Sequence, residues 1–164
     1  MFTAFSCQDA RKAKNYNDKT KADLDAINFI RGGIEGGLTE IKAANIAKEQ
    51  SSNPRIAQFA DMIIADHIRL GRELKKIETD KMIDDRDTIN ADHQIMLKAL
   101  ADKTGDDFDR AYIQMMVTDH EKAIELFTGA GDNTSATIQK VAENALPKLR
   151  MHLDSAKAIN ASLK

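Results

Sequence analysis

The amino-acid sequence predicts an all-α fold, a bundle of four long helices in which a crossover connection carries an extra short helix. Apolar residues recur at steps of three and four along four long segments, which is the period of a helix with one buried face. The chain has two prolines and eight glycines in 164 residues, which is few turn formers for an all-β fold. The connection between the second and third long segments spans about 25 residues, enough to return along the bundle. Such a crossover is typical of ferritin-like four-helix bundles.

The first two long helices are expected over residues 22–50 and 54–80. Between them, Asn53 supplies a capping side chain and Pro54 fits the first position of the second helix. The apolar face predicted for the first helix consists of Leu24, Ile27, Ile34, Leu38 and Ile41. The face predicted for the second helix is more regularly spaced and consists of Ile56, Ala60, Ile63, His67, Leu70, Leu74 and Ile77. The two segments should therefore form an antiparallel pair joined by a short turn.

The remaining elements follow a charged connector over residues 81–87. A short helix is expected over 88–103 and a third long helix over 106–128. After a glycine-containing loop over 129–133, a fourth long helix ends near Ser162. The predicted apolar face of the third helix consists of Ile113, Val117, His120, Ile124 and Phe127. That of the fourth consists of Ile138, Ala142, Ala145, Leu149, His152, Ala156, Ile159 and Leu163. An up-down-up-down bundle with a decorated loop is the alternative topology.

The N-terminal part of the chain indicates the cellular compartment in which the protein is expected. Residues 1–21 are predicted to be a signal remnant and flexible tether, and residues 22–164 to be the bundle domain. The run Ala4-Phe5-Ser6-Cys7 is similar to the end of a bacterial lipoprotein signal, and the polar residues that follow lack a periodic apolar face. This layout predicts a periplasmic or outer-membrane-associated protein with a lipid anchor at Cys7. The alternative is a cytoplasmic protein with a frayed N-terminus and an incidental thiol.

Charge and composition exclude several classes of function. The chain has 24 Lys and Arg against 26 Asp and Glu, a formal charge of −2, which offers no basic face to nucleic acid. It contains no run of about 18 apolar residues that could span a membrane. Its single cysteine excludes an internal disulfide and a cysteine-rich metal site. No serine stands in the strand-turn-helix context of a nucleophile elbow, so histidine and carboxylate side chains are the candidate functional groups.

Three of the four histidines, His67, His120 and His152, lie on predicted apolar faces. A buried imidazole needs partners, because an unpaired buried polar group costs about 1–3 kcal/mol. With a rise of about 1.5 Å per residue, the crossover topology brings all three within about 6 Å of the level of Glu40 on the first helix. In the up-down-up-down alternative, His152 moves roughly 13 Å away. The sequence therefore predicts a metal site formed by Glu40, His67, His120 and His152, and this site and the crossover topology support each other.

Imidazole and carboxylate ligands suit a transition-metal ion such as zinc, iron or copper. Three histidines and one further ligand are typical of tetrahedral zinc, or of an iron or copper site with an open position. Two alternatives remain. The histidines and Glu40 could form a buried hydrogen-bond network in a non-enzymatic envelope module. The protein could also bind a haem-type cofactor in a pocket beside the glycine stripe of Gly32, Gly33, Gly36 and Gly37. Each of these glycines weakens the helix by about 1 kcal/mol, which close helix approach or room for a ligand would explain.

Four further residues stand near the predicted site. Asp66 and Asp119 each precede a histidine, and adjacent helical residues point about 100° apart, so they are expected to be solvated or to pair between helices. His93 is expected at the surface. Pro147 is expected to bend the fourth helix one turn before His152, because it cannot donate the backbone hydrogen bond.

Five segments of the chain carry a family resemblance, namely Leu38–Ile41, Phe59–His67, Phe108–Ile113, Asp119–Ala123 and Leu146–Leu153. They resemble the bacterial "predicted outer membrane protein" domain of unknown function, a family placed with ferritin-like bundles and typically exported. The resemblance runs from about Lys21 to the end and implies fold and export, with no assigned activity. The chain departs from the di-iron ferritins, because Ile64 and Leu149 stand where their Glu-x-x-His motifs carry glutamate.

Overall fold

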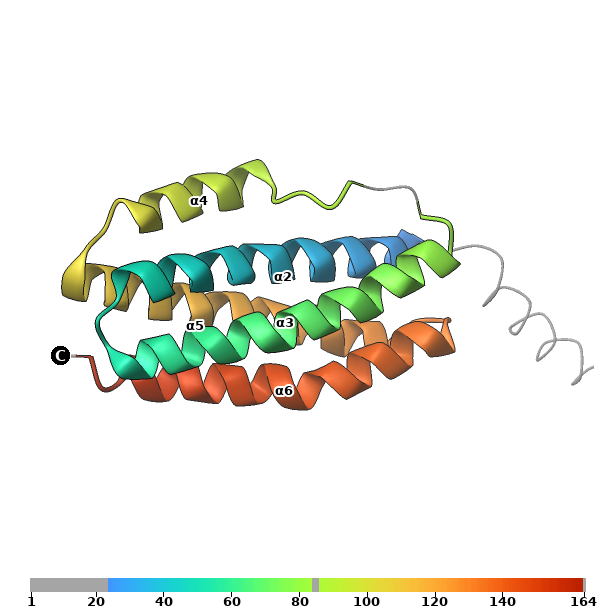
Figure 1. The fold of residues 1–164 in the computed structure, drawn as a ribbon. Coiled ribbons are helices and arrows are strands. Elements are labelled where there is room, and N and C mark those ends of the chain that lie inside the picture. Colours follow the sequence, from blue (N-terminus) through green and yellow to red (C-terminus); the bar gives the residue numbers. More distant parts are fainter. Residues whose placement is uncertain (1–23, 84–85, 164) are drawn as a thin grey trace, which may run out of the picture.

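The computed structural model describes residues 24–83 and 86–163 and contains four long helices, one short helix and one turn of 3₁₀ helix. No strand occurs within these two ranges. The elements, labelled as in Figure 1, are α2 (Leu24–Gln50), α3 (Pro54–Asp80), α4 (Ala91–Ala101), α5 (Gly105–Gly129), η1 (Ala130–Asp132) and α6 (Ala136–Asn160). The predicted all-α bundle is confirmed. The predictions about Cys7 and the tether lie outside the described residues and stay predictions.

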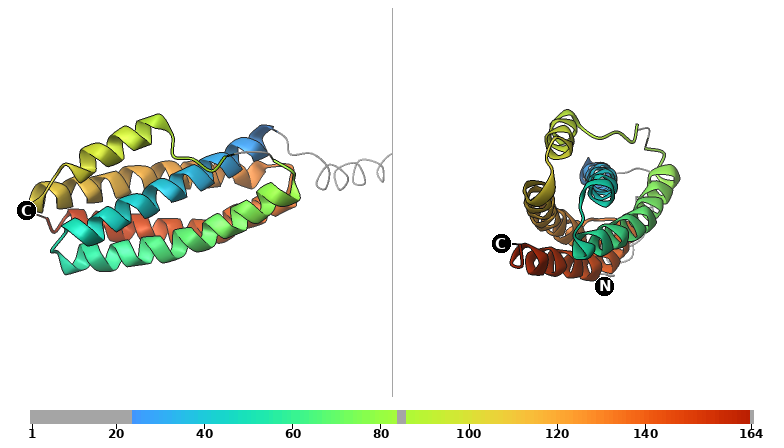
Figure 2. Two further views of the ribbon diagram at one scale, coloured as in Figure 1. Left: turned by 45° about the horizontal axis from the view of Figure 1, so that its top comes forward. Right: turned by 60° about the vertical axis from the view of Figure 1, so that its left-hand side comes forward.

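The chain path contains the predicted crossover. Helices α2 and α3 form an antiparallel pair, and the connection with α4 then runs back along the outside of α2 (Figures 1 and 2). Helix α5 consequently starts at the end of the bundle where α3 also starts, and α6 returns to that end (Figure 1). The parallel helices α3 and α5 lie diagonally opposite, while each adjacent pair of long helices is antiparallel (Figure 2). The up-down-up-down alternative is wrong.

Capping side chains fix where two of the helices begin. The side chain of Asn53 accepts a hydrogen bond from the Arg55 backbone N–H at 3.0 Å, and Pro54 occupies the first helical position. Asn90 caps α4 in the same way, accepting from the His93 backbone N–H at 2.8 Å. Helix α4 therefore starts later than predicted, because Asn90 has an extended backbone and fills the cap position.

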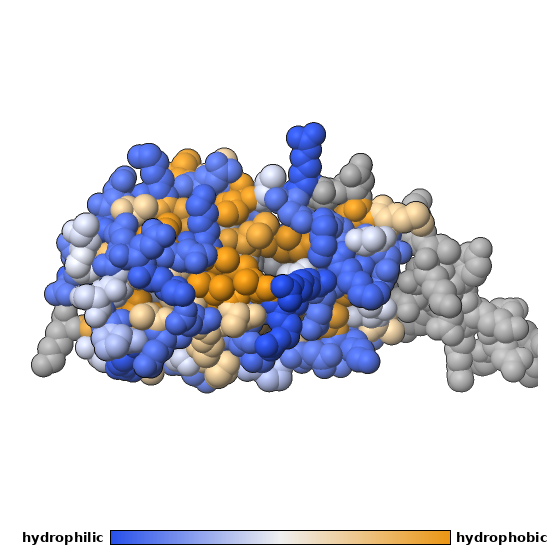
Figure 3. All heavy atoms as spheres, viewed as in Figure 1, coloured by the Kyte–Doolittle hydropathy of each residue, from blue (hydrophilic) through white to orange (hydrophobic). Residues whose placement is uncertain are grey.

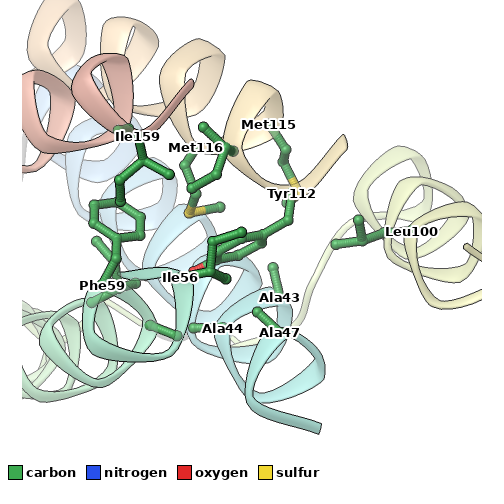
Figure 4. Packing of buried hydrophobic residues seen from close by; sticks show 14 of the residues in the cluster. Ala43, Ala44, Ala47, Ile56, Phe59, Leu100, Tyr112, Met115, Met116 and Ile159 are labelled. Atoms are coloured by element: carbon green, nitrogen blue, oxygen red, sulfur yellow. The ribbon is translucent and has the colours of Figure 1, made fainter. Parts of the chain in front are cut away.

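The hydrophobic core consists of two clusters on either side of a polar layer. The first cluster lies toward the α2–α3 turn and includes Ile56, Phe59, Tyr112 and Ile159 (Figure 4). The second lies toward the other end and includes Phe29, Ile30, Leu74, Phe127 and Ile138. On each long helix, the residues between the two clusters include one predicted metal ligand. The polar layer is therefore enclosed by apolar packing along the bundle axis.

Helix α4 closes one side of the first cluster. Its Leu97 and Leu100 are buried, whereas Ile95 is 68% exposed. Figure 3 shows hydrophobic side chains where α4 lies against α2, on a face that is otherwise largely hydrophilic. The crossover helix thus packs on the bundle through one narrow edge.

The prediction of the buried face of α2 is wrong in part. Of the five predicted residues only Ile34 is buried, and Leu24 is 69% exposed. The buried face is instead made of Ala26, Phe29, Ile30, Ile34, Thr39, Glu40, Ala43, Ala44 and Ala47. Most of these side chains are small and therefore less hydrophobic than the partly exposed leucines and isoleucines of the same helix. The hydrophobic pattern consequently selected the leucine and isoleucine positions instead of the face that packs against α3 and α5.

Two of the α2 glycines are expected to respond oppositely to alanine. A Cβ at Gly33 would lie 2.8 Å from Cδ1 of Leu74, whose side chain is fully buried, whereas a Cβ at Gly36 meets no atom within 4 Å. Gly33→Ala should therefore overpack the core and lower the free energy of unfolding by about 1 kcal/mol, even after the gain in helix propensity. Gly36→Ala should raise it by up to about 1 kcal/mol. Urea unfolding of both variants measures the difference, and equal effects would contradict the packing.

Candidate metal centre

The structure brings the four predicted residues together in one buried layer. Glu40 extends from α2, His67 from α3, His120 from α5 and His152 from α6, and each side chain is at most 5% exposed. One ring nitrogen of each histidine lies within 4.8 Å of the corresponding nitrogens of the other two. Four elements far apart in sequence therefore direct one carboxylate and three imidazoles toward a common point.

The contacts within the layer are close but incompletely hydrogen-bonded. The Oε2 atom of Glu40 lies 2.9 Å from His67 Nε2 and 3.5 Å from His120 Nε2. His120 Nε2 is 3.2 Å from His152 Nδ1. Glu40 Oε2 and His67 Nε2 are both fully buried, yet neither has a hydrogen-bond partner with suitable geometry among the described residues. Because an unsatisfied buried polar atom costs about 1–3 kcal/mol, this pair requires an explanation.

The outer nitrogens of two histidines have fixed partners. His120 Nδ1 lies 2.9 Å from the carbonyl oxygen of Met116, and His152 Nε2 lies 3.2 Å from Asp66 Oδ2. A carbonyl and a carboxylate accept hydrogen bonds, so we assign the imidazole protons to these outer nitrogens. Lys148 donates to the same Asp66 carboxylate at 2.9 Å, which keeps it ionised. The inner nitrogens, His120 Nε2 and His152 Nδ1, are then left with lone pairs that face each other.

The pKa shifts of three of the four groups in the layer, Glu40, His120 and His152, favour the protonation states that metal ligands need. Burial opposes the charged form of Glu40, but the surrounding imidazoles, His67 first, lower its pKa to about 2. Burial lowers the pKa of His120, and burial with the neighbouring His120 and His67 rings lowers that of His152 to about 4. Burial also opposes the charge on His67, but the adjacent Glu40 outweighs it and raises the pKa. At neutral pH the carboxylate is ionised and two imidazoles are neutral.

Asp66 and His93 have roles that the sequence indicated only in part. Asp66 proves to be an interhelical partner, joining α3 to His152 and Lys148 of α6. His93, expected at the surface, is only partly exposed: its side chain is 24% exposed and its Nδ1 is 2.7 Å from Glu35 Oε1. It fixes the start of α4 against α2, beside the polar layer but outside it. A contact of this kind depends on where the crossover helix lies, which periodicity does not report.

Helix α6 contains the bend that Pro147 predicted. Pro147 lies inside α6, one turn before His152, and the helix changes direction near its middle (Figure 1). Leu149 nevertheless packs in the second core cluster and Ala156 in the first. Pro147 falls between Ala142 and Leu149, which both belong to the second cluster, so the bend lies within that cluster, before the helix reaches His152 in the polar layer.

Comparison with solved structures supports the fold. The chain is similar to the structure titled "Crystal structure of DUF305 fragment from Deinococcus radiodurans", with a TM-score of 0.79 and 12% sequence identity. The alignment covers 87% of this chain and 99% of that one. At this identity the similarity concerns the fold alone. A comparison with curated proteins gives no match.

The family comparison covers most of the chain. Residues 11–159 match the family described as "Domain of unknown function (DUF4142)". None of the described helices is long and apolar enough to cross a membrane. The resemblance to an uncharacterised domain family is confirmed, while the export that it implied stays a prediction. The match includes all four long helices and all four residues of the polar layer, and the chain belongs to the DUF4142 family.

Proposed function

We propose that this protein binds one transition-metal ion between α2, α3, α5 and α6. The ligand atoms are a carboxylate oxygen of Glu40, Nε2 of His67, Nε2 of His120 and Nδ1 of His152. The donor set consists of three imidazoles and one carboxylate, which suits zinc, iron or copper. The polar layer is enclosed by the two hydrophobic clusters, so the ion would be shielded along the bundle axis.

The observation that carries this proposal is that His120 Nε2 and His152 Nδ1 direct their lone pairs at each other. With their protons donated to Met116 and Asp66, no proton remains for the 3.2 Å contact between His120 Nε2 and His152 Nδ1. Two lone pairs at this distance repel, and a cation between them converts the repulsion into coordination. A purely hydrogen-bonded network, the alternative function, does not remove this repulsion and leaves Glu40 Oε2 and His67 Nε2 unsatisfied.

Two of the donor separations are close to those around a metal of this class. Two ligands at about 2.0–2.1 Å from a tetrahedral zinc ion lie about 3.3 Å apart. The separation is 3.2 Å between His120 and His152, and 3.5 Å between His120 and Glu40. The Glu40–His67 separation of 2.9 Å is shorter and needs only a small rotation of either side chain. The outer contacts to Asp66 and Met116 would orient the ligating rings, as partners behind metal-bound histidines do.

Metal content tests the proposal directly. Protein purified without a histidine tag and reloaded with zinc, iron or copper should hold about one equivalent of ion, and His120→Ala should hold less than a tenth of that. The matched control is His93→Ala, which removes a partly buried histidine outside the layer and should keep the full equivalent. Elemental analysis after gel filtration gives the readout. Equal metal content in the two variants would show that the ion binds elsewhere.

A further inference from the structure

One side of the polar layer opens into a cavity of about 230 Å³ between α2 and α5. The glycine stripe of α2 forms one wall, and Leu126 and Phe127 of α5 contribute to the other. Glu40 and His67 lie at its inner end, whereas His120 is not among the residues that line it. The exposed Lys122 marks its outer end. A molecule in this cavity would therefore reach the proposed ion past Glu40 and His67.

The inner end presents buried polar atoms that make no hydrogen bond of suitable geometry within the described part of the chain. Glu40 Oε2 and His67 Nε2 are at least 95% buried by side chain and have no hydrogen bond. Asp119, which also lines the cavity, has a fully buried Oδ2 without a hydrogen-bond donor. A metal ion would satisfy the first two atoms, but it leaves Asp119 Oδ2 needing an N–H or O–H group.

Charge and size narrow the class of molecule that fits. Three carboxyl groups line the cavity, and each faces a basic side chain that also lines it: Glu35 faces His93, Glu40 faces His67 and Asp119 faces Lys122. The lining therefore offers no excess of positive charge to an anion, and the glycine, leucine and phenylalanine walls disfavour a strongly hydrated cation. The volume is below the roughly 300–1,000 Å³ of pockets for drug-sized ligands, which favours a compact molecule over one of haem size.

We propose that this cavity binds a small neutral molecule as an exogenous ligand of the metal. This molecule has a compact apolar body, a lone-pair atom that coordinates the ion, and an N–H or O–H group that donates to Asp119 Oδ2. The inference rests on the proposed metal site and adds the side from which that site is reached. Gly36 is essential to it, because a side chain there would project into the cavity, with no atom within 4 Å of its Cβ.

The test uses imidazole as the probe, since it carries both a lone-pair nitrogen and an N–H group. The full chain is loaded with Co²⁺, whose visible bands report its ligands, and titrated with imidazole and with 1-methylimidazole, which lacks the N–H. Imidazole should change the bands in a saturable way and bind about fivefold more tightly than 1-methylimidazole. Asp119→Ala should abolish this preference while keeping the cobalt.

A matched glycine pair tests the location. Gly36→Leu should retain cobalt but weaken imidazole at least about tenfold, because the leucine fills the cavity. Gly71→Leu is the control, since Gly71 also has an open Cβ position on a long helix but lies outside the residues that line the cavity. It should bind imidazole like the wild type. Cobalt-loaded protein that ignores imidazole, or a Gly36→Leu variant that binds it normally, would overturn this inference alone. Failure to bind cobalt at all would overturn the metal site as well.

Discussion

Saturating the metal-free protein with Zn²⁺ is expected to raise its unfolding midpoint by about 10 °C. An ion present at a thousandfold excess over its dissociation constant stabilises the folded state by about 4 kcal/mol. For a chain of 164 residues each kcal/mol corresponds to about 2–4 °C. The stabilisation should be large because the apoprotein carries two opposed lone pairs and two unsatisfied buried atoms, which the ion relieves. Calorimetry with and without Zn²⁺, and again after chelation, measures the shift.

A near-isosteric variant isolates the contribution of the carboxylate to this shift. Glu40→Gln keeps the size of the side chain but removes the only carboxylate of the proposed ligand set, so most of the zinc-dependent shift should disappear. Glu35→Gln is the matched control. Glu35 lies on the same helix and pairs with His93 at 2.7 Å, outside the polar layer. The metal assignment fails if zinc stabilises Glu40→Gln as much as Glu35→Gln, or stabilises neither of them nor the wild type.

The fold was predictable because the long helices carry strong periodic signals and clear boundaries. In α3, the predicted face from Ile56 to Ile77 is buried except for the half-buried Leu70, and Asn53 and Pro54 mark its start. The buried face of α2 was harder to predict. Four alanines, a threonine and a glutamate make up more than half of it, and such residues become core only where neighbouring helices approach closely. Burial there is decided by tertiary packing, which the local pattern does not contain.

The level of the candidate site could also be predicted, since it depends only on helix rise and chain direction. Counting from the α2–α3 turn placed Glu40 and three histidines at one height, and the structure places them together. The partners behind the ligands could not be derived in the same way. Whether Asp66 reaches His152 depends on the rotation of α3 relative to α6 and on side-chain rotamers. The contact of His93 with Glu35 likewise depends on where α4 packs.

The stability of the metal-free protein is expected to fall by about 3 kcal/mol between pH 6.5 and pH 4. The pKa of His152 drops from its ordinary value of 6.5 to about 4 on folding, because burial and the neighbouring histidines disfavour its charged form. Over this interval the His152 imidazole is protonated in the unfolded chain but stays largely neutral in the folded protein, so acid favours unfolding. A difference of about 2.5 pH units at about 1.4 kcal/mol each gives this magnitude. His120, whose pKa is also lowered, acts in the same direction.

The pKa shifts of His67 and Glu40 determine how stability depends on pH above and below this interval. The pKa of His67 is raised in the folded state, so its contribution is complete below pH 6.5 and is lost as the pH rises above that value. Glu40, with a pKa lowered to about 2 from 4.5, loses its contribution only below about pH 4.5. Urea unfolding should therefore show maximal stability near pH 6.5–7 and a decline toward acid. His152→Gln removes the main titrating group and should flatten the decline between pH 6.5 and 4. The role of His152 as a metal ligand depends on its being buried and neutral. A free energy of unfolding that stays constant or increases as the pH falls from 6.5 to 4 would contradict that state.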